Sequence, residues 1–137
     1  MTAQILVVED EGIVAKDLEN RLIALGYAVP AVVSGGEQAI EKARETRPDL
    51  ALMDILIEGK MDGIEAAAAI RAKEMATGGH IPIIAMTAHA VKGFRERCLA
   101  AGMDDYITKP INPEELFRAV EAAAATSVRR PVECSSS

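Results

Sequence analysis

Asp54 is the residue whose place in the sequence says most about chemistry. It follows an apolar run at residues 50–53 that is typical of a buried strand, and it opens a loop that closes at Asp62. Open α/β proteins bind ligands outside the carboxyl ends of their strands. An aspartate at such a place can act as a nucleophile and carry a phosphoryl group. The sequence therefore indicates Asp54 as the centre of a candidate site.

Three further places in the sequence would bring polar groups to the same edge of a sheet. Glu9 and Asp10 follow the first apolar run, Thr87 follows the fourth and Lys109 follows the fifth. With Asp54 they supply carboxylates, a hydroxyl and an ammonium. Carboxylate oxygens suit Mg²⁺, and an ammonium is a point charge for a phosphoryl oxygen. The set predicts a metal-assisted phosphoryl group on an aspartate.

The elements that would position these residues alternate between strand and helix. Apolar runs predict strands at residues 5–8, 28–33, 50–53, 81–86 and 106–108. Helical spacing of apolar residues, capping residues and glycine stops place a helix after each of them. Such βα units with apolar strands predict an α/β protein, with a parallel sheet covered by helices on both faces.

Local signals add detail to this outline. Pro30 interrupts the second run and predicts an edge strand. Ser34 and Glu37 are spaced as a capping box before the second helix, and Asn112 with Glu115 has the same spacing before the last one.

Composition limits the classes of function. Half of the 137 residues are hydrophobic and the formal net charge is −6, which predicts one folded domain and disfavours nonspecific binding to nucleic acid or anionic membranes. Without a membrane-spanning run or a basic leader, we expect a cytoplasmic protein. Cys98 and Cys134 are too few for a disulfide framework or a zinc site, and Cys98 is expected in the core.

Five sequence blocks resemble the signature of receiver domains, the phospho-accepting modules of two-component signalling. They are Val8-Glu9-Asp10-Glu11, Met53-Asp54-Ile55, Met61-Asp62-Gly63, Met86-Thr87-Ala88 and Ile107-Thr108-Lys109-Pro110. The resemblance covers residues 4 to about 125 and implies a flavodoxin-like (βα)5 fold with strand order 2-1-3-4-5. We expect a receiver domain over residues 1–125, and a disordered tail or cut linker over residues 126–137.

The resemblance implies a role for each residue of the site. Asp54 matches the phosphorylated aspartate, Lys109 would contact a phosphoryl oxygen, and Thr87 would donate its hydroxyl to the phosphoryl group. Thr87 and Tyr106 match the pair that moves on phosphorylation. Their movement would reshape the face made by the fourth helix, the fifth strand and the fifth helix. Asp62 is expected to cap the third helix rather than to take part in the chemistry.

The implied cofactor is Mg²⁺. Its ligands would be Glu9, Asp10, Asp54 and the backbone carbonyl of Leu56. Two features depart from the usual family pattern: Glu9 stands where Asp is commoner, and the stretch from Asp54 to Asp62 is one residue longer and lacks a proline. The longer loop leaves its contacts with partners open.

The implied function is that of a response regulator receiver. It would take a phosphoryl group from a phosphohistidine on a histidine kinase or phosphotransfer protein and act on a downstream effector. It would not be an enzyme beyond its own phosphorylation and slow autodephosphorylation, and a homodimer through the switch face is one expected assembly. No direct partner among nucleic acids or membranes is expected.

Three alternatives stay open at this point. The chain could be the receiver module of a hybrid histidine kinase in a phosphorelay, or a pseudo-receiver that serves only as an interaction module. A phosphohydrolase of the haloacid-dehalogenase type also uses an aspartate nucleophile. That class needs a second aspartate two residues later, where this sequence has Leu56.

Overall fold

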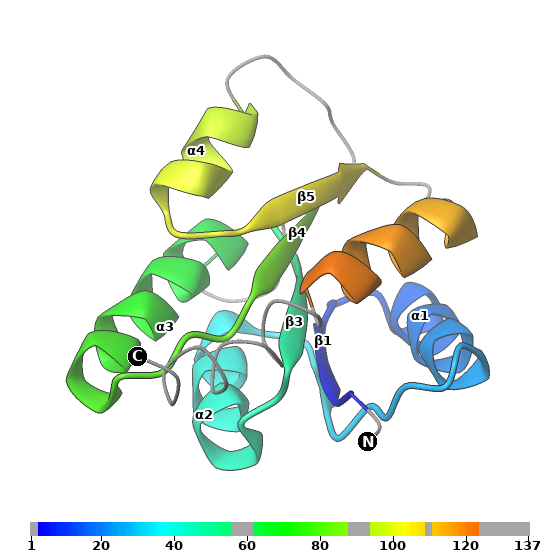
Figure 1. Ribbon diagram of the computed structural model, residues 1–137, viewed down its shortest axis with the longest axis horizontal. Helices are drawn as coiled ribbons and strands as arrows, with labels where there is room; N and C mark the ends of the chain where they lie inside the picture. Colours follow the sequence, from blue (N-terminus) through cyan, green and yellow to red (C-terminus); the bar gives the residue numbers. More distant parts are fainter. Residues whose placement is uncertain (1–2, 56–61, 88–93, 109–110, 124–137) are drawn as a thin grey trace, which may run out of the picture.

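The computed structural model describes residues 3–55, 62–87, 94–108 and 111–123, and strands and helices alternate through them as predicted (Figure 1). The elements are β1 (Ile5–Val8), α1 (Gly12–Ala24), β2 (Val32–Val33), α2 (Gly36–Thr46), β3 (Leu50–Asp54), α3 (Gly63–Thr77), β4 (Ile83–Thr87), α4 (Phe94–Ala100), β5 (Asp105–Thr108) and a last helix over residues 113–123.

The strands form one parallel sheet in the order β2-β1-β3-β4-β5, which confirms the flavodoxin-like topology. Its register decides what meets at the carboxyl edge. Val8 pairs with Met53, so Glu9 and Asp54 are the next residues on adjacent strands. Thr87 ends β4, the strand on the other side of β3. Residues far apart in the sequence are thus brought to one edge.

Helices cover both faces of the sheet, and β1, β3 and β4 are fully buried because their alternate residues point to opposite faces, both of which are covered. On one face the strands pack against α2, α3 and α4 (Figure 1). The buried side chains of this face include Met53, Ala66 and Cys98. On the other they pack against α1 and the last helix, in a cluster that includes Leu22 and Leu116. This two-sided aliphatic core fixes the sheet on which the site is built.

Two local predictions need correction. Only Val32–Val33 forms β2, with an isolated bridge between Gln4 and Ala28. Proline has no N–H to donate to a ladder, so Pro30 shortens this strand, although its edge position is confirmed. Ser34 does not cap α2.

The start of α2 shows why the capping prediction is wrong. Gly35 is the N-cap and makes no side-chain capping bond. The backbone N–H of Ser34 instead donates to Gln38 Oε1 at 3.2 Å, so the side chain of Gln38 reaches back over this turn. At the last helix the prediction holds: Asn112 Oδ1 accepts from the N–H groups of Glu114 and Glu115 at 2.8 and 3.4 Å.

None of the helices that the structure describes is long and apolar enough to cross a membrane.

Candidate functional site

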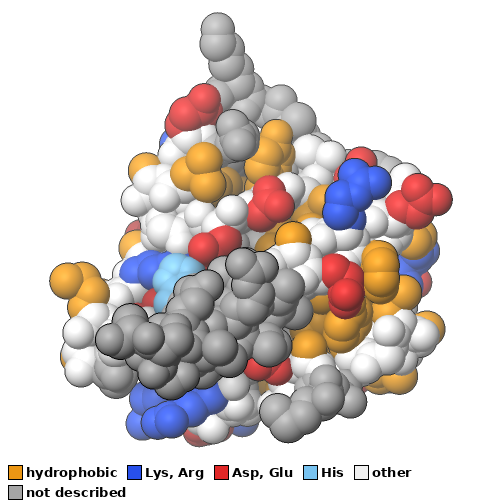
Figure 2. Space-filling view, viewed as in Figure 1, with side chains coloured by type: hydrophobic (Ala, Val, Ile, Leu, Met, Phe, Trp, Pro, Cys, Tyr) orange, Lys and Arg blue, Asp and Glu red, His pale blue; other side chains and the backbone are white. Residues whose placement is uncertain are grey.

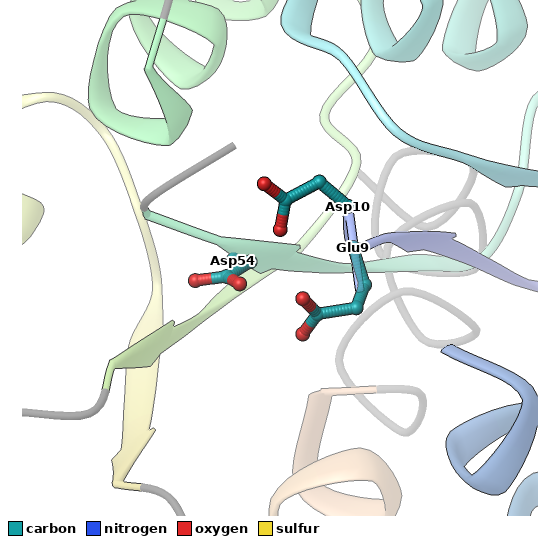
Figure 3. A group of neighbouring side chains, drawn as sticks. All are labelled: Glu9, Asp10 and Asp54. Atoms are coloured by element: carbon teal, nitrogen blue, oxygen red, sulfur yellow. The ribbon is translucent and has the colours of Figure 1, made fainter. Parts of the chain in front are cut away.

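Glu9, Asp10 and Asp54 converge at the carboxyl edge of the sheet (Figure 3). One carboxylate oxygen from each lies within 4.8 Å of the others. The exposed fractions of Glu9 and Asp54 are only 2% and 5%, and Asp10 is half-buried. Figure 3 shows Glu9 and Asp10 at the end of β1 and Asp54 at the end of β3, with their carboxylates around a common space.

Strand pairing and local hydrogen bonds hold these side chains in place. The N–H of Glu9 donates to Val33 O at 2.9 Å, and Glu9 Oε2 accepts from the N–H of Glu11 at 3.2 Å. Asp54 is the last residue of β3, and the N–H of Ile55 donates to Met86 O at 3.1 Å. Every buried side-chain nitrogen and oxygen of the described residues has a hydrogen-bond partner. The site is therefore preorganised.

The electrostatics and the donor set of this cluster fit a hard divalent cation. Like charges this close repel by on the order of a few kcal/mol per pair at an effective dielectric constant of about 20. A cation between them reverses the sign of the interaction. All the donors are carboxylate oxygens, which Mg²⁺ accepts while keeping several waters, whereas zinc favours nitrogen and sulfur. Glu9, Asp10 and Asp54 are thus the described residues that could hold a metal ion.

Thr87 lies at the end of β4, next to the strand that carries Asp54, and Tyr106 lies on β5, one strand further out. Thr87 is buried, with an exposed fraction of 4%, and its backbone pairs with Thr108. Tyr106 is half-buried and pairs with Ala85. It packs against the hydrophobic core on the face of the sheet covered by α2, α3 and α4. Residues two apart on a strand share a face, so Thr87 points to the same face as Ala85. The predicted switch pair thus lies on adjacent strands.

Some predicted residues lie outside the part of the chain that the structure describes. They are Lys109, its neighbour Pro110, the metal-ligand candidate Leu56, and residues 126–137 of the expected tail. Their predicted roles stay predictions.

Asp62 caps α3 as expected. Its Oδ1 accepts from the N–H of Glu65 at 2.8 Å, and Glu65 Oε1 accepts from the N–H of Asp62 at 3.1 Å, which completes a capping box. Cys98 lies in the core as predicted, and burial raises the pKa of its thiol.

Two features near the site were not foreseen. A hollow of about 460 Å³ beside the carboxylates is lined in part by Lys16, Ser34 and Gln38. The N–H of Gly63 donates to Ile55 O at 2.8 Å, next to Asp54. In the sequence, the only sign of this contact is that a glycine directly follows the capping Asp62. That Gly63 lies against Ile55 is known only from the tertiary structure.

Comparisons with known proteins agree with this geometry. A family model described as the response regulator receiver domain matches residues 5–121. Hybrid signal transduction histidine kinase I of Dictyostelium discoideum is 41% identical over 85% of this chain. Transcriptional regulatory protein PdtaR of Mycobacterium tuberculosis is 34% identical over 89% of it. The matches span 7% and 57% of those two relatives, so they concern a part of each protein.

A solved structure extends the likeness to the fold. The receiver domain of sensor histidine kinase PA1611 from Pseudomonas aeruginosa PAO1 has a magnesium ion coordinated in its active site cleft. It is 40% identical to this chain, covers 91% of this chain and 99% of its own, and gives a TM-score of 0.80. Sequence, topology and the acidic edge of the sheet all point the same way, and the chain belongs to the response regulator receiver domain family.

Proposed function

We propose that this chain accepts a phosphoryl group on Asp54, in a Mg²⁺-dependent reaction, from a phosphohistidine of a histidine kinase or a phosphotransfer protein. The observation that carries the proposal is the convergence of Asp54 with Glu9 and Asp10 at the carboxyl edge of a receiver fold. The magnesium ion in the active site cleft of the PA1611 receiver supports the choice of metal.

The transfer can be written with the residues of this chain. A carboxylate oxygen of Asp54 attacks phosphorus, the new P–O bond forms as the P–N bond breaks, and the electron pair of that bond stays on the histidine ring of the donor. Glu9 and Asp10 would hold Mg²⁺, which when bound offsets the negative charge of carboxylate and phosphoryl oxygens. Thr87 would donate its hydroxyl to the phosphoryl group, and Lys109 its ammonium.

Phosphorylation would be read out as a shift between two states. Thr87 would move toward the phosphoryl group, and Tyr106, which already packs against the core on the adjacent strand, would turn inward. The face of α4, β5 and the last helix would change shape and present itself to an effector or to a second copy of the chain. The chain would thus act as a switch rather than as an enzyme on separate substrates.

The similar proteins are compatible with two settings. Two of the similar proteins, at 41% and 40% identity, belong to histidine kinases. In a hybrid kinase the domain would receive the phosphoryl group within one protein and pass it to a phosphotransfer protein. Others are DNA-binding response regulators such as MtrA, and a DNA target would support a cytoplasmic location for the receiver. Either setting uses the same chemistry at Asp54.

Chemical labelling tests the proposal directly. The protein is incubated with acetyl phosphate and Mg²⁺, and the intact mass is measured. We expect the addition of one phosphate, which chelator prevents and Asp54→Asn abolishes. Asp49→Asn is the matched control, because Asp49 lies just before the other end of the same strand. Efficient labelling of the Asp54→Asn variant, or none of the wild type, would contradict the assignment.

A further inference from the structure

We propose that Gly63 is a positioning residue for Asp54. The absence of a side chain lets the start of α3 lie against the backbone of Asp54 and Ile55, and this contact sets the direction of the Asp54 carboxylate. The inference rests on the proposed function of Asp54 as phosphoryl acceptor, but the contact itself is a feature of the fold.

The space around Gly63 shows how close the approach is. A Cβ atom built on Gly63 would lie 2.3 Å from Asp54 O, 2.8 Å from Ile55 Cα and 3.0 Å from Asp54 C. All three are backbone atoms, which cannot swing aside as the end of a side chain can. The N–H of Gly63 also donates to Ile55 O at 2.8 Å. The φ angle of Gly63 is not positive, so other residues could adopt its backbone conformation. Glycine is required here because there is no space for a side chain.

The helix cannot easily retreat from an added methyl group. Its first turn is closed by the Asp62–Glu65 capping box. Ala66 and Ala67, with exposed fractions of 0%, and Ile70 bury its inner face in the core. Close-packed interiors transmit strain rather than absorb it. Part of the displacement must therefore fall on the end of β3.

That end of β3 is where the proposed chemistry takes place. Relief of a 2.3 Å approach to ordinary contact needs a shift of about 1 Å, and misplacement of a reacting group by that distance costs on the order of 100-fold in rate. The Asp54 carboxylate shares a 4.8 Å cluster with Glu9 and Asp10, so the same shift should weaken the metal site. Gly63 would thus affect both phosphoryl transfer and metal binding through its contact with Asp54.

The test compares Gly63→Ala with Gly79→Ala. Gly79 is a fair control because a Cβ there would meet nothing within 4 Å and no positive φ is involved. Two quantities are measured: the labelling rate at saturating acetyl phosphate and Mg²⁺, and the Mg²⁺ affinity of the unphosphorylated protein by calorimetry. We expect Gly63→Ala to lower the labelling rate roughly 10- to 100-fold and to weaken Mg²⁺ binding. Gly79→Ala should change neither.

A third variant separates positioning from general loss of stability. Ile70→Val removes a methylene from the same helix face, buried in the core away from Asp54. Labelling and Mg²⁺ affinity are compared below the melting temperature of each variant. If Ile70→Val lowers both quantities as much as Gly63→Ala does, or if Gly63→Ala lowers neither, the proposal is overturned.

Two further outcomes stay informative. If Gly63→Ala does not fold, Asp62→Ala replaces it, because loss of the cap frees the start of α3 without adding atoms to the contact. Its labelling rate should then fall roughly 3- to 10-fold, and an unchanged rate would overturn the positioning role. If the wild type is not labelled at all, the proposed function fails, and the Mg²⁺ affinities of the variants still decide the role of Gly63.

Discussion

Ionised side chains gather at both ends of the sheet, but in opposite arrangements. At the carboxyl edge, Glu9, Asp10 and Asp54 bring like charges within 4.8 Å of one another. At the amino end of β4, Arg71 lies between the carboxylates of Glu74 and Asp104, at 2.6 and 2.7 Å. The charges of the first arrangement repel one another, whereas those of the second attract.

The second group, which we call the Arg71 cluster, consists of Arg71, Glu74, His80 and Asp104. Its side chains also satisfy backbone groups. Arg71 donates to Gly102 O at 2.7 Å, and Asp104 accepts from the N–H of Ile83 at 2.8 Å. His80 Nε2 lies 3.0 Å from Asp104 Oδ1, and Figure 2 shows the histidine beside basic and acidic side chains. The cluster thus joins α3, the start of β4 and the turn before β5.

The difference in charge arrangement distinguishes a candidate functional site from a cluster of ion pairs that joins parts of the fold. Proteins depart from favourable local electrostatics mainly at functional sites, and offset the cost elsewhere. Here three like charges are clustered at the carboxyl edge, whereas the Arg71 cluster combines opposite charges. The two ends should therefore respond with opposite signs to the same chemical change.

Removal of the Arg71 guanidinium should have the largest effect on the free energy of unfolding. Arg71→Met leaves Glu74 and Asp104, with side-chain exposures of 11% and 35%, close together without their cation. We expect a loss of about 2–4 kcal/mol in the free energy of unfolding, measured by urea titration. Lys42→Met is the control, because its pair with Glu45 is 44% exposed on both sides and should be worth less than about 1 kcal/mol. Similar small losses for both variants would contradict this view of the cluster.

Matched neutral substitutions compare the two ends most directly. Without metal, Asp104→Asn should destabilise the protein by about 1–2 kcal/mol, because it weakens charge-assisted bonds to Arg71 and Ile83. Asp10→Asn should stabilise it by about 0.5–1 kcal/mol, because it removes one of the clustered like charges, whose repulsion is reduced by solvent at the half-buried Asp10. Both are measured by thermal melts in chelator. Effects of the same sign would remove the distinction between the two ends.

Mg²⁺ should stabilise the protein through the carboxyl edge of the sheet and not through the Arg71 cluster. A metal that binds the folded state adds about 1.4 kcal/mol at roughly ten times its Kd, which corresponds to a rise of roughly 4–7 °C in Tm. We expect most of this rise to disappear in Asp10→Asn and to persist in Asp104→Asn. A Tm for the wild type that is the same in chelator and in millimolar Mg²⁺ would argue against the metal site.

The smallest effect concerns the apolar layer between the two ends, where Cys98 is buried. Burial raises the pKa of this thiol above its ordinary value of 9.0. The folded state therefore favours the neutral thiol, and its contribution to stability is complete below pH 9 and is lost as the pH rises through the folded-state pKa. Above pH 9, stability should fall more steeply in the wild type than in Cys98→Ala. Parallel curves would mean that the thiolate is tolerated there.

Local signals in the sequence were enough to predict the strands and helices and part of the candidate site. Period-two and period-3.6 patterns depend on nearby residues alone, so β1 was predicted with its observed bounds and Asn112 as the cap of the last helix. The same patterns place Asp54 at the end of a strand wherever that strand lies in the sheet. The strand order came from family resemblance, because periodicity carries no information on which strands are neighbours.

The tertiary structure alone decided the rest. The meeting of Glu9 with Asp54 was expected from the sequence, but the register between β1 and β3 that achieves it, across 45 residues of sequence, was not. Likewise, the contact of Gly63 with Asp54 and the bond of Arg71 to Asp104 depend on how α3 packs against the sheet. The sequence by itself determined which groups stand at the ends of strands and helices. Which of these groups meet depends on long-range pairing and packing, whose energies belong to the whole fold.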